Sequence, residues 1–369
     1  MAKVGIIGTG WGARVQVPAF REAGLVIGGI AGAHRTKTRR LADELGTAAF
    51  DDWRAVIADP SIDIVTITTP PAEHVEMAIA ALDAGKHVIC EKPTALNARE
   101  AERIAAAAKA HRDRLALVDH ELRFLPAWRT ARERIGEIGA VRYVEVRYAS
   151  PGRGDRKREW NWWSDAERGG GIWGAVGSHF VDTLRYLGLE IEAAQGLMHT
   201  AIAERPFGDG TRRVTADDVV AVHLRLRGGA VAMLAISAVA SGPDEPAMIT
   251  IHGESGAMRL VSEELLMSEP FKPFARIAGG PMQQRPGNSP GGAFGTGTLL
   301  FGQALRAALD DGDRDALALA ATFEDGLAQQ RVLDAARQSA ENDGRWEPVS
   351  TTAKNGILRF AQDDTRNRT

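Results

Sequence analysis

The chain has 369 residues, of which 44% are hydrophobic and 25% are charged, and its formal net charge is −3. This composition is typical of a globular protein with two domains, and the small charge gives no field that favours nucleic acid or a membrane surface. Cys90 is the sole cysteine, which excludes an internal disulfide. No apolar run reaches a membrane-spanning length, and a strand pattern begins at Lys3 without room for a secretion signal, so we expect a cytoplasmic protein.

A glycine-rich turn, residues 8–13, follows the first predicted strand. Gly8 permits a tight turn, Gly10 allows a phosphate to approach the backbone, and Ala13 is small enough for close helix–strand packing. A helix that begins near Trp11 would direct its N–H groups and its dipole at a pyrophosphate. The turn predicts a dinucleotide site, and an ordinary glycine-rich loop is the alternative.

Strand and helix patterns alternate through the first part of the chain. Short apolar runs that end at turns predict buried strands, and segments with helical spacing separate several of them. The predicted strands are Lys3–Ile7, Leu25–Ala31, Ile62–Thr68, His87–Cys90 and Leu115–Val118, and the predicted helices are Ala72–Ala84 and Ala98–Ala110. The alternation predicts an N-terminal Rossmann domain, residues 1–122, with a doubly wound parallel sheet. Such sheets bind ligands at the carboxyl ends of their strands, so the turns after these strands should share one edge.

The segment after the second strand indicates which dinucleotide is bound. An acidic residue there would bind the ribose hydroxyls of NAD. This chain instead has Ala33-His34-Arg35-Thr36-Lys37, with no acidic residue before Asp43. Arg35 and Lys37 can neutralise a 2′-phosphate, and Thr36 can donate a hydrogen bond to it. We therefore expect NADP to be preferred over NAD, and a solvated basic start of a helix is the alternative.

The pattern changes after about residue 122. The longer predicted strands, several of them alternating in polarity, are Val141–Tyr148, Asp218–Leu226, Ala230–Ser237 and Met248–His252. They predict a C-terminal α+β domain, residues 123–348, with a large, mostly antiparallel open sheet. A free sheet face commonly forms subunit contacts, so we expect a homodimer or a homotetramer. We further predict a mobile loop at Gly279–Gly297, a long helix at Asp315–Asn342 and a polar tail at 349–369.

A glycine run in the second domain leads into a helix that carries candidate acid–base residues. The run is Gly169-Gly170-Gly171, and the helical pattern that follows contains His179 and Asp182. These two residues are three positions apart, so they share a face of the helix. Histidine titrates near neutrality and is suited to proton exchange, whereas a satisfied structural histidine is the alternative.

As a set, these residues resemble the Gfo/Idh/MocA oxidoreductases, which include glucose–fructose oxidoreductase and inositol dehydrogenase. The resemblance covers roughly residues 3–348. It rests on motifs distributed along the chain: Gly8-Thr9-Gly10, Pro70-Pro71 with His74, Gly85-Lys86-His87-Val88 leading into Glu91-Lys92-Pro93, the segment from Gly169 to His179, and Thr322-Phe323-Glu324-Asp325-Gly326-Leu327 with Trp346.

The resemblance implies NAD(P)-dependent oxidation or reduction of a sugar, a polyol or a related alcohol or carbonyl compound. Lys92 would hold the substrate oxygen near the nicotinamide, and His179 would exchange the hydroxyl proton. The residues implied to bind the cofactor are Gly8, Gly10, Trp11, Ala13, Pro70, Pro71, His74 and Glu91. No metal is expected, because the histidines and aspartates show no ligand spacing and hydride transfer from a secondary alcohol needs none.

One position departs from the family pattern. The family usually has aspartate four residues before the histidine, where this chain has Ala175. Asp182 is the local substitute, and we expect it to orient His179. The departure leaves open a second function, a non-catalytic NAD(P)-binding regulator or sensor, although the presence of Lys92 and His179 favours an enzyme.

Three further sets of residues have two interpretations each. Trp162 and Trp163 could pack on the C–H face of a sugar, or they could serve core or subunit packing. Arg123 could contact the substrate or form a structural salt bridge. The basic cluster at 153–158 could attract an anionic substrate, although a solvated loop is favoured.

Overall fold

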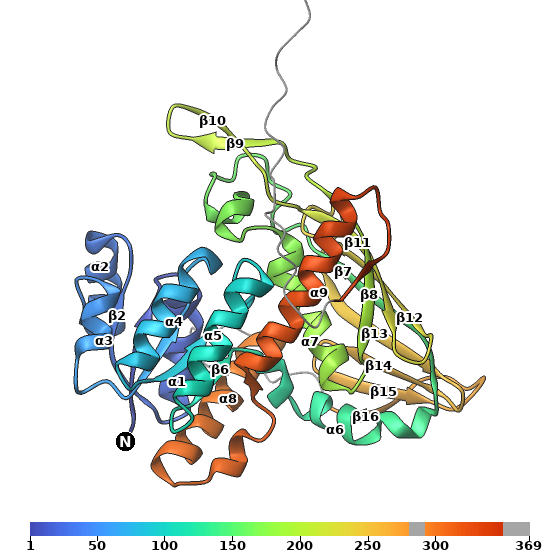
Figure 1. The fold of residues 1–369 in the computed structure, drawn as a ribbon, viewed down its shortest axis with the longest axis horizontal. Coiled ribbons are helices and arrows are strands. Elements are labelled where there is room, and N and C mark those ends of the chain that lie inside the picture. Colours follow the sequence, from blue (N-terminus) through green and yellow to red (C-terminus); the bar gives the residue numbers. More distant parts are fainter. Residues whose placement is uncertain (280–291, 350–369) are drawn as a thin grey trace, which may run out of the picture.

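The computed structural model describes residues 1–279 and 292–349. Two sheets dominate it, and helix α9 (Phe323–Glu341) lies between them, in contact with both helix α5 (Ala98–Ala110) and strand β8 (Ile191–His199) (Figure 1). The expected tail from residue 350 and most of the expected loop at 279–297 lie outside the described residues.

The first sheet is the predicted Rossmann sheet. Its order is β17-β6-β5-β4-β1-β2-β3, and every neighbouring pair is parallel except β17–β6. The strands are β1 Lys3–Ile7, β2 Val26–Ala31, β3 Ala48–Ala49, β4 Ile64–Ile67, β5 His87–Cys90, β6 Ala116–Val118 and β17 Ala321–Thr322. With α5, the helices along it are α1 Val17–Glu22, α2 Arg35–Leu45, α3 Trp53–Ala58 and α4 His74–Asp83.

Both faces of this sheet are covered, which explains why its strands are continuous apolar runs. Successive residues of a strand point to opposite faces, and Ile6 and Ile7 accordingly belong to two different hydrophobic clusters. The cluster that contains Ile7 includes residues of α4 and α5, whereas the cluster that contains Ile6 includes Phe20 of α1 and Phe301 of helix α8 (Gly292–Asp310).

The second sheet is large and mostly antiparallel, as predicted. Its order is β16-β15-β14-β13-β7-β12-β11-β8-β18, and only β7–β12 is parallel. The strands besides β8 are β7 Val141–Ala149, β11 Val219–Leu226, β12 Val231–Ser237, β13 Glu245–Gly253, β14 Ala257–Val261, β15 Glu264–Ser268, β16 Ala275–Ala278 and β18 Glu347–Pro348, and a separate hairpin comprises β9 Glu204–Phe207 and β10 Gly210–Arg213.

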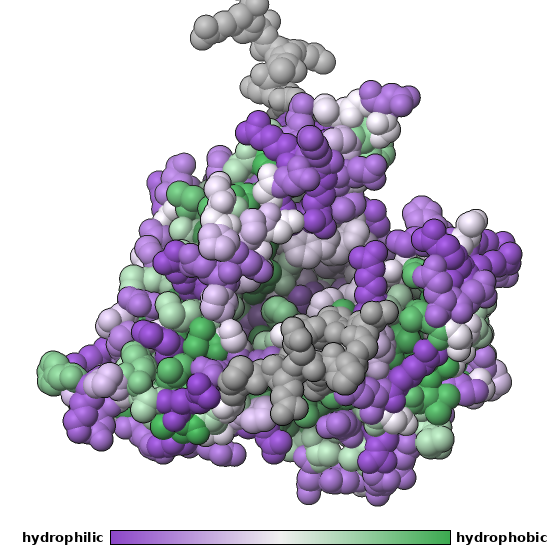
Figure 2. Space-filling view, turned by 180° about the vertical axis from the view of Figure 1, so that it is seen from behind, coloured by the Kyte–Doolittle hydropathy of each residue, from purple (hydrophilic) through white to green (hydrophobic). Residues whose placement is uncertain are grey.

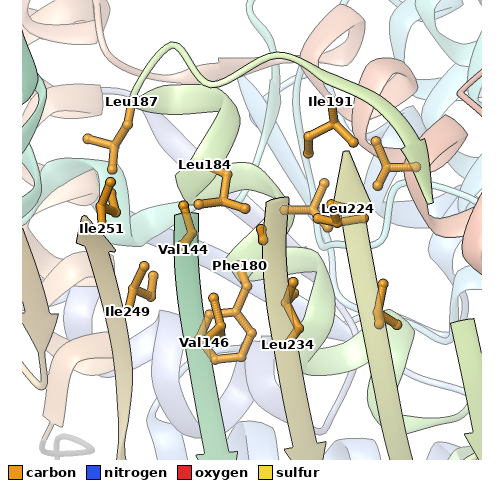
Figure 3. Close-up of a cluster of buried hydrophobic side chains, with 14 of the residues drawn as sticks. Val144, Val146, Phe180, Leu184, Leu187, Ile191, Leu224, Leu234, Ile249 and Ile251 are labelled. Atoms are coloured by element: carbon orange, nitrogen blue, oxygen red, sulfur yellow. The ribbon is translucent and has the colours of Figure 1, made fainter. Parts of the chain in front are cut away.

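One face of the second sheet packs on helices. Phe180 and Leu184 of helix α7 (Ser178–Tyr186) point at Val144 and Val146 of β7 and at Leu234 of β12 (Figure 3). Buried and exposed residues alternate strictly along most of β11, as they should where only one face is covered. Helices α6 (Pro126–Arg134) and α9 contribute to the same core.

Several expectations about elements need correction. The predictions missed β8, the β9–β10 hairpin, β14 to β16 and helix α8, whose first residues fall in the expected loop. The long helix begins at Phe323 and not at Asp315, because Thr322 and Asp325 form a capping box at this point. Since β17 and α8 pack on the first domain, segments from the end of the chain complete it. The boundary at residue 122 stays a prediction.

The outer surface of the protein is mixed in character. Hydrophilic residues cover most of one face, hydrophobic residues form scattered patches, and the face is hollowed near its centre (Figure 2). Within the described ranges, no helix combines the length and the apolar character that a membrane crossing requires. The expected cytoplasmic location stays a prediction.

Candidate functional site

The glycine-rich turn after β1 has the room and the backbone shape that a pyrophosphate requires. Gly8 has φ +134°, and a Cβ there would collide with Thr68 Oγ1, so only glycine fits. At Gly10 a Cβ would meet nothing within 4 Å, which leaves the backbone open on that side. Gly12 is also closely packed, because a Cβ there would lie 2.5 Å from Thr68 Oγ1 and 2.7 Å from Ile6, and Ala13 is buried. Trp11 is half-buried beside the turn.

The helical turn after Trp11 is a wide π turn, Gly12–Gln16, that continues into α1. The helix therefore begins where the turn predicted it. π turns are rare and frequently mark functional sites. This part of the structure fits a bound dinucleotide.

A basic hollow lies at the end of β2. Its lining residues are Ala33, His34, Arg35, Thr36, Lys37 and Arg40, and its volume is about 650 Å³. Arg35, Thr36 and Lys37 are exposed in the first turn of α2, where free backbone N–H groups add to the attraction for an anion. Asp51, which the sequence did not assign to this region, lies 3.8 Å from Arg35 Nε and partly offsets its charge.

His74 is a buried residue that connects two loops of the site. Its side chain is fully buried, with Nε2 2.9 Å from the carbonyl of Thr69 and Nδ1 3.2 Å from that of Pro93. Burial lowers the pKa of His74 to about 4, which favours the neutral ring, and its one N–H can donate to one of these two carbonyls. His74 thus links the loops after β4 and β5. Pro70 is partly exposed on the first of these loops, and Pro71 is buried.

Lys92 occupies the end of β5, as predicted, and its ammonium group is held in place. Lys92 Nζ donates a hydrogen bond of 2.9 Å to the carbonyl of Ala175. Ala175 lies in a second π turn, Trp173–Gly177, that leads into α7. The position where an aspartate was expected therefore contacts Lys92 through its backbone.

Three buried carboxyl groups, those of Glu91, Asp119 and Glu121, lie close enough to Lys92 for its charge to act on each of them. Burial, and then the neighbouring charge of Asp119, raise the pKa of Glu91 well above its ordinary value. Burial also raises the pKa of Glu121 and that of Asp119, although hydrogen bonds from Gln16 and Glu91 oppose the change in Asp119. These shifts favour a proton retained within this group of carboxyls, and a protonated Glu91 would donate a hydrogen bond to Asp119.

A buried hydrogen-bond chain supports that assignment. Thr66 Oγ1 donates to Gln16 Oε1 at 2.7 Å, and Gln16 Nε2 donates to Asp119 Oδ2 at 2.7 Å. The chain leaves Asp119 as a pure acceptor, which suits an ionised carboxylate. Glu91 therefore takes part in a network beneath Lys92, in addition to its predicted place beside the cofactor.

Asp182 has a different partner from the expected one. It accepts hydrogen bonds from Arg123 Nε at 2.9 Å and from Arg123 Nη2 at 2.6 Å, and both side chains are buried. Among the residues that the structure describes, His179 Nδ1 has no hydrogen-bond partner. The expected pairing of Asp182 with His179 is corrected, and the geometry supports the salt-bridge interpretation of Arg123.

His120, which the sequence reasoning missed, lies between these groups. Its ring is 5.8 Å from that of His179, edge to face, and its Nδ1 is 3.8 Å from Asp182 Oδ2. Gln329 Nε2 is a donor to the carbonyl of Ser178 at 2.6 Å, so its contact of 2.9 Å with His120 Nε2 is a donation as well. His120 is therefore neutral with its proton on Nδ1, in agreement with burial, which lowers its pKa to about 4. Its place just after β6, at the ligand-binding edge, was the available signal.

The tryptophan pair is only partly buried. The two rings are 5.6 Å apart, and the guanidinium of Arg153 lies 4.9 Å from the ring of Trp163. Trp163 also packs against the core of the second domain. A contact of Trp162 or Trp163 with a substrate stays a prediction.

Metal binding is the last of the expectations about the site. Within residues 1–279 and 292–349, no three His, Cys, Asp or Glu side chains are grouped to hold a metal ion. The expectation that none is used stays a prediction.

The comparisons with known proteins agree with this geometry. Residues 2–120 match the model of an oxidoreductase family with an NAD-binding Rossmann fold, and residues 128–259 match the GFO/IDH/MocA C-terminal domain. The chain belongs to the Gfo/Idh/MocA oxidoreductase family. The resemblance inferred from the sequence motifs is confirmed, and so are the Rossmann domain and the large antiparallel sheet.

Relatives of this Gfo/Idh/MocA member match most of its length. An uncharacterised oxidoreductase of Synechocystis sp. is 33% identical over 76% of this chain and 77% of its own. The glucose-fructose oxidoreductase domain-containing protein 2 of Homo sapiens is 30% identical over 94% and 93%. A crystal structure of an oxidoreductase domain protein from Kribbella flavida has a TM-score of 0.83 at 28% identity, covering 95% of this chain and 100% of its own. Levoglucosan dehydrogenase in complex with NADH has the same TM-score and coverages at 26% identity.

Proposed function

We propose that this family member transfers a hydride between NADP(H) and the hydroxyl-bearing carbon of a carbohydrate-like alcohol, or the corresponding carbonyl compound. The observation that carries the proposal is the position of Lys92. Its ammonium group is fixed at the carbonyl of Ala175, beside the helix of His179 and at the edge where the dinucleotide turn ends.

When bound, the nicotinamide would supply the hydride acceptor or donor. The remaining roles in the reaction would belong to residues of this chain. Lys92 would bind the reacting oxygen and stabilise the charge that develops on it. Burial, and then the charge of Lys92, lower the pKa of His179 well below its ordinary value. The imidazole is thereby held in the neutral form that a proton acceptor requires, while its basicity is reduced.

The preference for NADP rests on the basic hollow at the start of α2. None of the described residues that line it is acidic, although Asp51 lies 3.8 Å from Arg35 Nε. Three exposed polar or basic residues, Arg35, Thr36 and Lys37, are available to a 2′-phosphate. The levoglucosan dehydrogenase complex contains NADH. The proposal therefore distinguishes this chain from that relative, and NAD binding is the coarser statement that the family match supports.

The proposed substrate class is supported by the family and by the solved relatives. One of these relatives is levoglucosan dehydrogenase in complex with NADH and levoglucosan. A polyhydroxylated ring is therefore the first class to test, with Trp162 and Trp163 as candidate contacts.

We also propose that the protein assembles as a homodimer or a homotetramer through the open face of the second sheet. Tyr143, Leu197 and Met233 are large, exposed hydrophobic residues on β7, β8 and β12 of this sheet. Light scattering after size-exclusion chromatography should give at least twice the chain mass of 39.6 kDa.

A cofactor-reduction screen tests the central proposal. The purified protein would be incubated with NADP⁺ or NAD⁺ and a panel of sugars, inositols and anhydrosugars, with the reverse reaction tested on their keto forms. Turnover of any one compound, lost in Lys92→Met, would support the enzyme. Tight cofactor binding without turnover of any compound would favour the regulator or sensor that Ala175 leaves open.

A further inference from the structure

Phe294 contacts His179, and it belongs to a segment of the chain that contains none of the site residues described above. Its ring centroid is 4.9 Å from that of His179, with an interplanar angle of 51°. The same ring makes an edge-to-face contact of 6.4 Å with Trp11 of the glycine-rich turn. Phe294 therefore bridges the dinucleotide turn of the first domain and the histidine helix of the second.

The position of Phe294 is set by the helix that carries it. Phe294 is in the first turn of α8, and Thr298 Oγ1 donates a hydrogen bond of 2.8 Å to its carbonyl. Two turns later, Phe301 is buried in the core of the first domain and stacks on Phe124 at 4.9 Å. A helix anchored in this way presents the phenyl ring from a fixed direction.

Among the described residues, no carboxylate forms a hydrogen bond with His179 Nδ1. Burial is the main cause that disfavours protonation of the ring, and the positive charge of Lys92 acts in the same direction, whereas the neighbouring His120 is neutral. Asp182 is bound to Arg123, and the usual aspartate position is Ala175. His179 is 4% exposed, and its Nδ1 has no partner among the described residues. The orientation of the imidazole therefore depends on packing.

We propose that Phe294 is the positioning residue for His179: its ring fixes the imidazole and keeps water away from it. The acid–base role of His179 rests on the proposed function, whereas the contact itself does not. A phenyl ring at this distance removes water from one side of the imidazole and disfavours its charged form. Without the ring, the imidazole gains both water and rotational freedom.

The test compares Phe294→Ala with Phe294→Leu, which keeps an apolar cover, and with Phe301→Leu, a control in the same helix. The Cε1–H resonance of His179 would be followed by NMR in protein labelled with ¹³C-histidine, with and without NADPH, and assigned through His179→Gln. In Phe294→Ala the titration of His179 should move to higher pH, toward that of an ordinary histidine. In Phe294→Leu it should move less, and in Phe301→Leu it should stay as in the unmodified protein.

The second measurement is the pH dependence of turnover on a substrate from the screen. Phe294→Ala should lose roughly tenfold to a hundredfold in kcat, with KM for the cofactor nearly unchanged, and its acidic limb should shift to higher pH. An unchanged His179 titration in Phe294→Ala would overturn the inference whether or not a substrate is found. A shifted titration in a protein that turns over nothing would uphold the contact and count against the proposed function alone.

Discussion

Replacing Asp182 with asparagine should destabilise the protein more than it impairs chemistry. Asp182 and Arg123 are 6% and 7% exposed, and two hydrogen bonds of 2.9 and 2.6 Å join them. Asp182→Asn leaves the guanidinium buried with one remaining carboxylate, Asp325, whose oxygen is 3.5 Å away. Removing one partner of a buried ion pair typically costs about 3–5 kcal/mol. Because Asp325 stays in place, we expect the lower end, about 3 kcal/mol.

Urea unfolding followed by circular dichroism gives the measurement, with the shift of the midpoint read against an unchanged slope. Asp325→Asn is the matched control, because this carboxylate is 32% exposed, its contact is longer, and asparagine keeps an oxygen that can accept from Thr322 in the capping box. It should cost less than about 1 kcal/mol. The double variant Arg123→Met/Asp182→Leu removes both charges and should recover most of the loss.

Two results would refute this reasoning. The first is a cost below about 1 kcal/mol for Asp182→Asn, which would mean that the pair is solvated. The second is a double variant as unstable as the single one, which would mean that packing, and not an unpaired charge, explains the loss. Turnover per folded molecule should change little in Asp182→Asn compared with the loss of stability, when both are expressed as free energies. The reason is that Asp182 contacts Arg123 and not His179.

Three further predictions address the cofactor, the reaction and pH. Arg35→Asp should weaken NADPH binding roughly tenfold or more while changing NADH binding little, as measured by fluorescence titration. Arg39→Asp is the control, because Arg39 is equally exposed but lies outside the hollow. Tighter binding of NADH than of NADPH by the unmodified protein would contradict the proposal. Lys92→Met should lower the rate of single-turnover hydride transfer by about a hundredfold or more. Lys109→Met, on the exposed side of α5, is the control and should leave this rate unchanged. An unchanged rate in Lys92→Met would remove the basis of the mechanism. His74 has a folded-state pKa of about 4 against an ordinary 6.5, so between these values the unfolded chain binds the proton. Its contribution to stability is present above pH 6.5 and is lost as pH falls to 4, with a slope of up to about 1.4 kcal/mol per pH unit. Urea unfolding at several pH values in that range gives the free energy of unfolding as a function of pH. This free energy should change less steeply with pH in His74→Gln than in the unmodified protein. An equal dependence on pH in the two proteins would show that His74 is not the responsible group.

The sequence predicted those helices and strands whose own residues favour the conformation that the folded protein gives them. The strand His87–Cys90 and the helix Ala98–Ala110 have the predicted bounds, because one is a short apolar run between turns and the other is rich in alanine, with an Asn97 cap. Strand β8 was missed because Ile191–His199 contains alanine and glycine, and its extended form depends on pairing with β11. Helix α8 contains four glycines, so packing on the first domain outweighs its weak intrinsic preference for a helix.

The site was predictable where motifs share one edge of the sheet and unpredictable where partners come from distant segments. Lys92 and the glycine-rich turn were placed correctly at that edge, since the carboxyl ends of parallel strands meet there. The pairing of Asp182 with Arg123 spans 59 residues, and that of His120 with Gln329 spans 209. Spacing along a helix suggested that Asp182 serves His179, but a buried guanidinium is a stronger partner for a carboxylate.

The return of the chain to its first domain has a consequence for biosynthesis. Strand β17 closes the edge of β6, and Phe301 and Leu305 of α8 cover the same core as Phe20. The domain that is first in sequence is therefore incomplete until residue 322 has left the ribosome, about 200 residues after β6. At ordinary rates of translation this interval lasts roughly 10–40 s. During it, the nascent chain exposes a sheet edge and an apolar helix face, so we expect chaperones to engage this protein during its synthesis and a fragment of residues 1–122 to aggregate.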